Sequence, residues 1–551
     1  MQISLYFFAF ALLVAVYTYI FHSFYPILEN KPLSWTESLL FVVESMTTVG
    51  YGDLLPFSAD LTRLLAIEIM ISGVVMIFVV IPLLIAPFLS SLLAPSPPRR
   101  TPHALFGHII VFGYDELTRS IIESMAISDH DIVIIEQDKS VALGIATMYR
   151  KRAYVIWGDY TDPDTWAGAH LGHADHIVIS KDERLTANIV LSIRELAKGR
   201  IIAVVDKLSF DRYLRYAGAE DVISPKHSTG MILAGHAVLK MNGETLPDIP
   251  GFDRISIDSR HTPGDELRLI NIPVVPGCRA EGKRLQEIEL FRRYGVVVLF
   301  LWKAGTFIVH PSDDDVIDRT TSLFIFGRGS AILAAIRDEF DAGRRTESVA
   351  VIAGFGDVGS AAYQELSSAG VSCVVVDLTP HNVNQVVGNA EDERILKQAH
   401  IEEAQFCIVA LNDDDLNIFT TLMARNLNPE IRILARANSP ASTDKLYRAG
   451  ADFVALLPSI GGQTIAKIIL ADTVTILLDL PNGEMVIMKR VTKPDHRTVS
   501  WFARRTGVRI IGIESQSRSL VTPEPRETLS EGDMVITVGN NEQLKKFIRL
   551  V

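Results

Sequence analysis

One stretch of this 551-residue chain reads Glu44-Ser45-Met46-Thr47-Thr48-Val49-Gly50-Tyr51-Gly52-Asp53 and lies between two long apolar segments. Gly50 and Gly52 can adopt backbone angles that L-residues avoid, so successive carbonyl groups can turn toward one axis. Val49 and Tyr51 would then point away from that axis and brace the strand. The hydroxyl of Thr48 would add one more oxygen at the inner end. The stretch therefore predicts a row of oxygen atoms that replaces the water around an ion.

The apolar segments on either side of this stretch are long enough to cross a membrane. Residues 3–21 contain no charged side chain, and at about 1.5 Å per helical residue they can span a hydrocarbon core about 30 Å thick. A signal peptide is the alternative, but no basic residue precedes the run, and the run is too long for the apolar region of a signal peptide. Residues 34–47 predict a short helix with Ser34 as its N-cap. A second long helix is expected from about residue 61 to residue 93, so the intervening non-helical backbone should line a water-filled path.

The pentapeptide Thr48–Gly52 and the Asp53 that follows it resemble the selectivity filter of the tetrameric potassium channels. The resemblance implies a homotetramer in membrane lipid, with K+ as the permeant ion and carbonyl groups from four chains around it. It assigns the selectivity filter to Thr48, Val49, Gly50, Tyr51 and Gly52.

Two acidic residues flank the filter, Glu44 before it and Asp53 directly after it. In some channels of this family a glutamate at the equivalent place shares a proton with the aspartate after the filter. Two carboxylates in one poorly hydrated space cannot both ionise cheaply. Glu44 and Asp53 are therefore expected to support the filter as a proton-sharing pair, and an independent partner for Glu44 is the alternative.

The second apolar segment carries three residues at which a helix can bend. Gly73 lies midway, and Pro82 and Pro87 each remove one helical hydrogen bond and crowd the carbonyl four residues before. These three residues are the predicted gating hinge. The alternative is that both prolines only mark the exit from the membrane.

Charge and cysteine content place most of the chain in the cytosol. Arg99 and Arg100 follow the second apolar segment, and positive residues favour the cytoplasmic side. Both termini of a multi-pass protein of the cell inner (plasma) membrane are therefore expected to be cytoplasmic. The three cysteines, Cys278, Cys373 and Cys407, are odd in number and predict no disulfide framework. The net charge of -12 and the pI near 5.7 argue against a nucleic-acid partner.

The length of the chain predicts at least three domains. Residues 1–95 form the expected two-helix pore module, and residues 96–104 form a stiff, proline-rich linker. Beyond the linker, short apolar strands alternate with helices, which is typical of a doubly wound parallel sheet. We predict an all-α transmembrane tetrameric pore followed by two α/β Rossmann-like domains, residues 105–345 and 346–551, each with a smaller α+β C-terminal lobe.

The two cytoplasmic domains read as a duplication. The run His108–Asp115 is echoed by Ser348–Asp357, and Ile132–Glu136 is echoed by Cys373–Asp377. This double unit resembles the RCK domain, the regulator of potassium conductance, over roughly residues 105–551. The resemblance implies that four chains supply the eight RCK units of a ligand-operated gating ring.

The second copy carries an intact glycine turn for binding a dinucleotide. Its sequence is Gly354-Phe355-Gly356-Asp357-Val358-Gly359. The first glycine permits the turn, the second lets a pyrophosphate approach the backbone, and the third lets the helix pack close to the strand. Asp377 ends the next strand and is the expected ribose ligand, and its charge disfavours the 2'-phosphate of NADP relative to NAD or ADP. Arg436 is the candidate phosphate partner, and Asn389 is assigned to the same site.

The first copy reads Gly113-Tyr114-Asp115-Glu116-Leu117-Thr118 and keeps only the first glycine. Asp115 and Thr118 occupy space that a pyrophosphate would need, and Asp115 would repel it. We expect a degenerate nucleotide site that mainly assembles the ring. Since Glu136 still matches the ribose-binding carboxylate, an altered nucleotide mode stays open.

Three acidic runs remain, namely Asp182-Glu183, Asp313-Asp314-Asp315 and Asp413-Asp414-Asp415. None has EF-hand spacing, and no His or Cys pair has zinc-ligand spacing. A Ca2+ site that uses one of these runs is an alternative to plain solvated loops, and no metal ligand is assigned.

The predicted protein is a potassium-selective channel that is gated by cytoplasmic ligands and catalyses no reaction. A membrane-anchored NAD-dependent oxidoreductase is the alternative from another class, but the sequence offers no convincing substrate domain with a His or Lys acid-base partner. A regulatory subunit of a separate transporter is a third hypothesis, which the filter in the same chain makes redundant.

Overall fold

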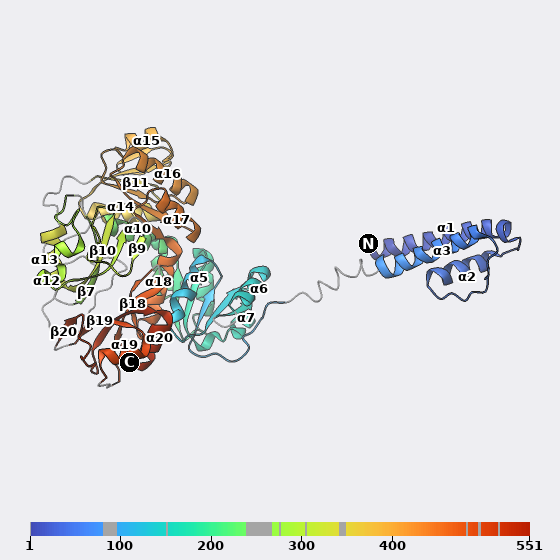
Figure 1. The fold of residues 1–551 in the computed structure, drawn as a ribbon, viewed down its shortest axis with the longest axis horizontal. Coiled ribbons are helices and arrows are strands. Elements are labelled where there is room, and N and C mark those ends of the chain that lie inside the picture. The colour runs from blue at the N-terminus through green and yellow to red at the C-terminus, as the bar shows by residue number, and fades with distance from the viewer. Residues whose placement is uncertain are drawn as a thin grey trace. The chain divides into compact units, whose positions relative to one another are not determined.

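The computed structural model describes residues 2–80, 96–149, 153–237, 267–274, 277–303, 306–340, 349–480, 483–493, 497–515 and 518–551. The predicted hinge residues Pro82 and Pro87 lie outside these ranges. The chain divides into two compact units, Met1–Ser96 and Pro97–Val551, and each is described by itself (Figure 1).

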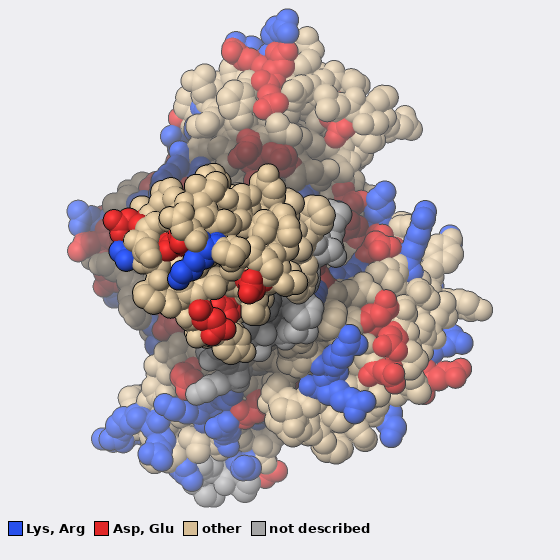
Figure 2. Space-filling model, turned by 90° about the vertical axis from the view of Figure 1, so that its right-hand side faces the viewer, with Lys and Arg blue, Asp and Glu red and all other residues tan. Residues whose placement is uncertain are grey.

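The N-terminal unit consists of three helices, α1 (Gln2–Glu29), α2 (Trp35–Met46) and α3 (Asp60–Val75), and α3 continues into a π-helical turn, η1 (Met76–Val80). The segments Tyr6–Glu29 and Asp60–Phe78 are long and apolar enough to cross a membrane. Few charged side chains are visible on this unit in Figure 2. Two helices long and apolar enough to span a membrane are therefore present, and the first is longer than the charge-free run predicted.

The short helix between the two spans has the predicted boundaries. Ser34 caps α2, since its Oγ accepts a hydrogen bond from the Glu37 amide at 3.2 Å and its own amide donates to Glu37 Oε2 at 2.8 Å. This reciprocal pair is a capping box, which satisfies amides that the first helical turn leaves free. The helix then packs through Val42 and Met46, both fully buried, against α1 and α3.

Gly73 is the point of closest approach between α3 and the end of α2. A Cβ atom on Gly73 would overlap the backbone of Met46. The glycine at this position therefore permits close helix packing, whatever its part in bending the helix.

We expect Gly73→Ala to destabilise the protein by about 1–3 kcal/mol, since rigid backbone has to move to admit the methyl group. Thermal unfolding of the detergent-solubilised protein measures this. Gly144→Ala is the matched control, because Gly144 is also helical and has no heavy atom within 4 Å of the added Cβ. Equal behaviour of the two variants would contradict the packing role.

The second unit, Pro97–Val551, contains two six-stranded parallel sheets with the same strand order, β3-β2-β1-β4-β5-β6 and β13-β12-β11-β14-β15-β16. The strands of the first sheet are β1 (His108–Phe112), β2 (Ile132–Glu136), β3 (Ala153–Trp157), β4 (Ala174–Ser180), β5 (Arg200–Val204) and β6 (Asp221–Ile223). Those of the second are β11 (Val349–Ala353), β12 (Ser372–Asp377), β13 (Gln385–Val387), β14 (Phe406–Val409), β15 (Arg432–Ala437) and β16 (Phe453–Leu456). The shared order confirms the predicted duplication and the α/β Rossmann-like fold.

Helices cover both faces of these sheets. In the first copy they are α5 (Glu116–Ser124), α6 (Lys139–Met148), α7 (Pro163–Gly168), α8 (Glu183–Ile193), α9 (Asp211–Ala217) and α10 (Pro225–Ala237), with short turns η2 (Met125–Ile127), η3 (Leu171–His173) and η4 (Leu208–Phe210). In the second they are α14 (Asp357–Ser368), α15 (Glu393–Gln398), α16 (Asp414–Leu427), α17 (Pro440–Arg448) and α18 (Leu457–Leu470).

Each copy ends in a smaller, antiparallel lobe, as predicted. The first has strand order β7-β10-β8-β9 and the second β17-β18-β21-β19-β20. The elements of the first are β7 (Leu267–Pro273), α11 (Leu285–Ile288), α12 (Leu290–Tyr294), β8 (Val297–Lys303), β9 (Thr306–Ile308), β10 (Thr321–Arg328), α13 (Gly329–Ala335) and the π-helical η5 (Ile336–Phe340). Those of the second are β17 (Thr475–Asp479), β18 (Glu484–Arg490), α19 (Val499–Thr506), β19 (Arg509–Glu514), β20 (Ser519–Val521), β21 (Met534–Asn540) and α20 (Asn541–Leu550).

The last helix of each parallel domain packs on the other copy. Helix α10 of the first copy lies against α14 of the second, and α18 of the second lies against α5 of the first (Figure 1). A Cβ on Gly230 of α10 would overlap the carbonyl of Val358, so these two backbones touch. We call α10 and α18 the crossed helices. Because of them, the two copies share their hydrophobic cores.

A partly buried carboxyl group lies close to the crossed helix α18. The Oδ2 of Asp479 accepts a hydrogen bond from Gln463 of α18 at 3.2 Å. Burial raises the pKa of Asp479 to about 6, with a smaller contribution from Glu123 of α5, while the hydrogen bond from Gln463 opposes the rise. The folded protein therefore retains a proton between about pH 4 and pH 6 that the unfolded chain releases, and stability falls as the pH rises through this window.

We expect Asp479→Asn to raise the thermal midpoint of the full-length protein at pH 7.5, because it removes the partly buried charge and keeps an acceptor for Gln463. The gain should shrink toward zero near pH 4, where the wild-type carboxyl is already neutral. Calorimetric scans of both proteins at the two pH values measure the difference. A gain that is the same at both pH values would show that ionisation of Asp479 is not its cause.

Candidate functional site

The predicted filter begins directly after the C-terminus of α2. The amides of Val49 and Gly50 donate to the carbonyl of Glu44 at 2.9 and 3.3 Å, which folds the chain back over the helix end. Gly50 and Gly52 have φ values of 57° and 78°, in the left-handed region that glycine tolerates. Thr48 has a φ of 62°, which is strained for a β-branched residue, and such strain is concentrated at functional sites.

The side chains of the filter stretch lack cover within a single chain. Val49 and Tyr51 are 56% and 69% exposed, although both are large and largely apolar. Exposed apolar side chains of this kind indicate a surface that another protein or a membrane covers.

Glu44 is buried, at 5% exposure, whereas Asp53 is exposed. The Oε2 of Glu44 has no hydrogen-bond partner among the described residues. Buried carboxylate oxygens nearly always have a partner, and the described residues do not supply one for this oxygen. The proton-sharing pair with Asp53 stays a prediction.

The glycine turn of the second copy connects β11 to α14. Gly354 has a φ of 94°, and a Cβ on Gly359 would overlap the carbonyl of Gly354. Gly356 faces open space, since the nearest heavy atom to a Cβ there is Asn412 Oδ1 at 4.0 Å. No side chain caps α14 at Gly356. The free amides of the first helical turn are therefore available to a phosphate group.

Asp377 lies at the end of β12, beside this turn. Its Oδ2 accepts a hydrogen bond from the Phe355 amide at 2.7 Å and its Oδ1 accepts one from the Thr379 amide at 2.8 Å. The carboxylate is only partly buried. His381 Nε2 also lies 3.6 Å from Oδ1. Oδ2 therefore keeps a lone pair for a ribose hydroxyl.

Arg436, at the end of β15, is 4% exposed. Its Nη2 donates to Asn438 Oδ1 at 2.7 Å and its Nη1 donates to Asn412 Oδ1 at 3.3 Å. Burial lowers the pKa of the Arg436 guanidinium from its ordinary value, and nearby carboxylates, Asp414 foremost, oppose this. The same Asn412 Oδ1 is the nearest heavy atom to the open space at Gly356. Arg436 therefore lies one side chain away from that space.

Asn389 makes its described hydrogen bonds within its own loop. Its Oδ1 accepts from the amide of Glu391 and its Nδ2 donates to Glu391 Oε2, both at 3.1 Å. No described contact joins it to Asp377 or Arg436, so its assignment to the nucleotide site stays a prediction.

The first copy fills the same region with its own side chains. Glu136 is 6% exposed and accepts hydrogen bonds from the amides of Tyr114 and Asp138, both at 3.0 Å, and from the hydroxyl of Tyr160 at 3.1 Å. Asp115 caps α5 by accepting from the Thr118 amide at 2.8 Å. The carboxylate and the helix amides that a nucleotide would use are therefore already occupied.

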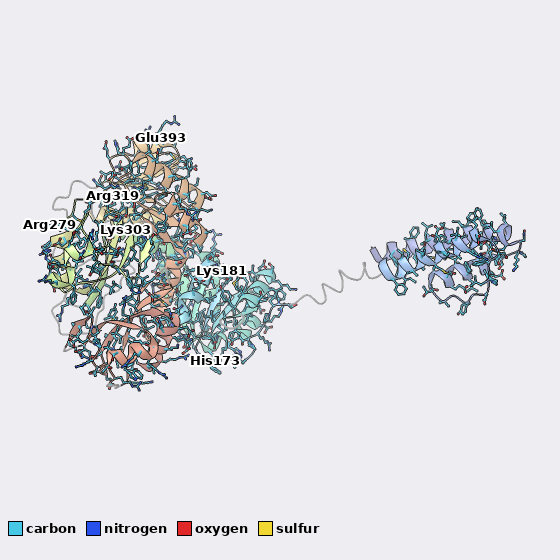
Figure 3. All side chains as sticks on the ribbon, viewed as in Figure 1. His173, Lys181, Arg279, Lys303, Arg319 and Glu393 are labelled. Atoms are coloured by element: carbon cyan, nitrogen blue, oxygen red, sulfur yellow. The ribbon has the colours of Figure 1, made fainter. Side chains whose placement is uncertain are left out.

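Two residues that fill this region, Tyr160 and Lys181, were not predicted from the sequence. We call the region that the first copy fills with its own side chains the internal plug. Lys181, labelled in Figure 3, packs its side-chain end over Gly113, and its Nζ lies 4.9 Å from the ring centre of Tyr160. Aligning the copies at Gly158 and Gly388 places Ala390 of the second copy at the position of Tyr160. That alignment alone could have shown that the second copy lacks the tyrosine.

The acidic runs serve local structure. Asp182 and Asp413 cap α8 and α16, Asp314 pairs with Arg284 at 2.7 Å, and Asp315 accepts the Ser312 amide at 2.7 Å. Within the described ranges, no group of three or more His, Cys, Asp or Glu side chains is arranged to hold a metal ion.

Comparison with known families matches both parts of the chain. The Ion channel family matches residues 7–88, the TrkA-N domain matches residues 109–225 and 350–457, and the TrkA-C domain matches residues 269–340. Potassium channel protein 1 of Methanocaldococcus jannaschii is 30% identical over 234 residues, which are 39% of this chain and 70% of that protein.

Two solved structures are similar over nearly the whole chain. The GsuK channel is 29% identical with a TM-score of 0.58, over 99% of this chain and 98% of its own. The GsuK channel bound to NAD is 28% identical with a TM-score of 0.56, over 100% of this chain and 99% of its own. These relatives are ion channels and not oxidoreductases.

Proposed function

Since this chain belongs to the family of potassium channels with cytoplasmic RCK domains, we propose that a nucleotide at the glycine turn of its second RCK copy controls its pore. The ligand carries an adenosine diphosphate group, as NAD and ADP do. Asp377 binds the ribose hydroxyls, the amides at the start of α14 bind the pyrophosphate, and Arg436 adds positive charge.

The contrast between the two copies supports this proposal most directly. In the first copy, the Tyr160 hydroxyl bonds Glu136 and Asp115 caps α5, whereas in the second copy Ala390 stands in place of the tyrosine and no side chain caps α14 at Gly356. A related channel, GsuK, has been solved with NAD bound. The charge of Asp377 favours NAD or ADP over NADP. Ca2+ has no part in the proposal, because the acidic runs are used for caps and ion pairs.

The proposal also includes the assembly of four chains into one channel. Thr48 to Gly52 from four chains form the filter for K+, with Glu44 and Asp53 behind it and Gly73 on the inner helix. Four chains with two RCK domains each, residues 105–345 and 346–551, supply the eight units of a gating ring. The pore module, residues 1–95, spans the inner membrane with both termini in the cytoplasm. Exposed Val49 and Tyr51 support burial between subunits.

Planar-bilayer recording of the purified channel tests the proposal, with NAD, ADP or NADP added to the cytoplasmic side. We expect NAD or ADP to change the open probability of the wild type, and NADP to act only at higher concentration. Asp377→Ala should remove the response and preserve the unitary conductance. NAD that binds tightly without altering open probability would be a structural cofactor, and would contradict control of the pore.

A further inference from the structure

The glycine turn of the second copy receives a cation from the first copy. Lys226, in the first turn of the crossed helix α10, has its Nζ 3.9 Å from the Oδ2 of Asp357, the first residue of α14. The same Nζ lies 2.7 Å from the Oδ2 of Asp206, from the loop after β5. The side chain is 24% exposed. Lys226 is therefore held between two carboxylates next to the start of α14.

The position of Lys226 is unfavourable for the stability of α10 itself. The N-terminus of a helix carries a partial positive charge, which repels a lysine in the first turn. The two carboxylates offset this repulsion, but Asp206 is exposed, and exposed ion pairs contribute little to stability. An anionic ligand beside Lys226 would add a favourable interaction at this helix start.

The equivalent positions in the other copy carry no charge. The strand pairing equates Ala203 with Ala435, so Val204 of the first copy stands where the second has Arg436. The start of α10, Ser224-Pro225-Lys226, corresponds to the start of α18, Leu457-Pro458-Ser459. Helix α18 packs on α5 as α10 packs on α14. Ser459 of α18 therefore lies at the glycine turn of the first copy where Lys226 lies at that of the second. Lys226 and Arg436 are thus found only at the turn of the second copy.

We propose that Lys226 of the first RCK copy binds the pyrophosphate group of a nucleotide held at the glycine turn of the second copy. The inference deepens the proposed nucleotide site and rests on it. Lys226 also neutralises Asp357, whose charge would otherwise repel the anion. Because a bound pyrophosphate draws the lysine toward α14 and away from Asp206, nucleotide binding tightens the contact between the two copies.

Titration calorimetry of the full-length channel in detergent tests this inference, with NAD as the probe. We expect Lys226→Ala to weaken NAD binding about tenfold or more, the factor that corresponds to a lost hydrogen bond between charged groups. Lys226→Arg should retain most of the affinity. Ser459→Ala, the matched control on α18, should leave it unchanged. Raising KCl should weaken NAD binding more in the wild type than in Lys226→Ala, since salt screens the contact that the variant has lost.

The outcomes separate the two proposals. A wild-type channel that fails to bind NAD would overturn the nucleotide site, and this inference with it. A wild type that binds NAD with the same affinity and salt dependence as Lys226→Ala would overturn the role of Lys226 alone. Thermal unfolding without nucleotide should give similar midpoints for both proteins, and a large drop in the variant that Lys226→Arg fails to restore would assign the lysine to folding instead.

Discussion

Replacing Gly50 by alanine is expected to abolish potassium conduction. Gly50 has a φ of 57°, and an L-residue in this conformation costs roughly 1–2 kcal/mol. No heavy atom lies within 4 Å of the added Cβ in the single chain, so the penalty arises from the backbone and not from a clash. In a tetramer all four chains carry this free-energy cost at the same axis. The carbonyl oxygens there must lie at the distances that a K+ ion requires.

Potassium flux into liposomes, together with reversal potentials in mixed Na+ and K+, measures this effect. Wild-type channels should reverse near the potassium equilibrium potential. Gly282→Ala is the matched control, because Gly282 has a similar φ of 79° and open space around it, but lies in the second unit. If Gly50→Ala conducts with unchanged selectivity, the filter assignment is wrong.

Replacing Gly356 by aspartate is expected to eliminate the NAD response while the protein folds normally. Gly356 has a φ of -70° and a ψ of -163°, which any residue can adopt, and its Cβ would point into open space. An aspartate there can cap α14 as Asp115 caps α5, by accepting a hydrogen bond from an amide of the first turn. The cap occupies the amides that the pyrophosphate needs and adds a repelling charge.

Calorimetry with NAD and bilayer recording should therefore show loss of binding and loss of ligand control, with the unfolding midpoint unchanged or slightly raised. Gly113→Asp in the first copy is the comparison, since its side chain would meet Lys181 and should disturb assembly more than nucleotide response. Equal NAD affinity in the wild type and Gly356→Asp would contradict the site.

The sequence was sufficient where neighbouring residues determine the structure. The N-cap at Ser34, the turn from Gly354 to Gly359 and the parallel, doubly wound type of both sheets follow from local patterns, and each was predicted. The reciprocal bond of Glu37 and the strand order were not predicted. Contacts between distant residues were not predicted. The hydrogen bond from Tyr160 to Glu136, the approach of Gly73 to Met46 and the ion pair of Lys226 with Asp357 depend on which helix packs where.

Asn389 is a case that local reasoning does not decide. Its described side-chain hydrogen bonds close a turn with Glu391, and its place in the nucleotide site stays a prediction. Residue type and order along the chain cannot distinguish a side chain that binds a ligand from one that shapes its own loop.

The crossed helices determine when the apolar surface of the first copy is covered during synthesis. The apolar face of α5 is completed by α18, and the core of the first sheet includes Phe502 and Phe547 from the last lobe. At about 5–20 residues per second, the ribosome exposes that face long before its cover emerges. A chain that stops after the first copy would keep the face uncovered and be prone to aggregate. Joining both copies in one polypeptide therefore ensures that each nascent domain meets its proper complement first.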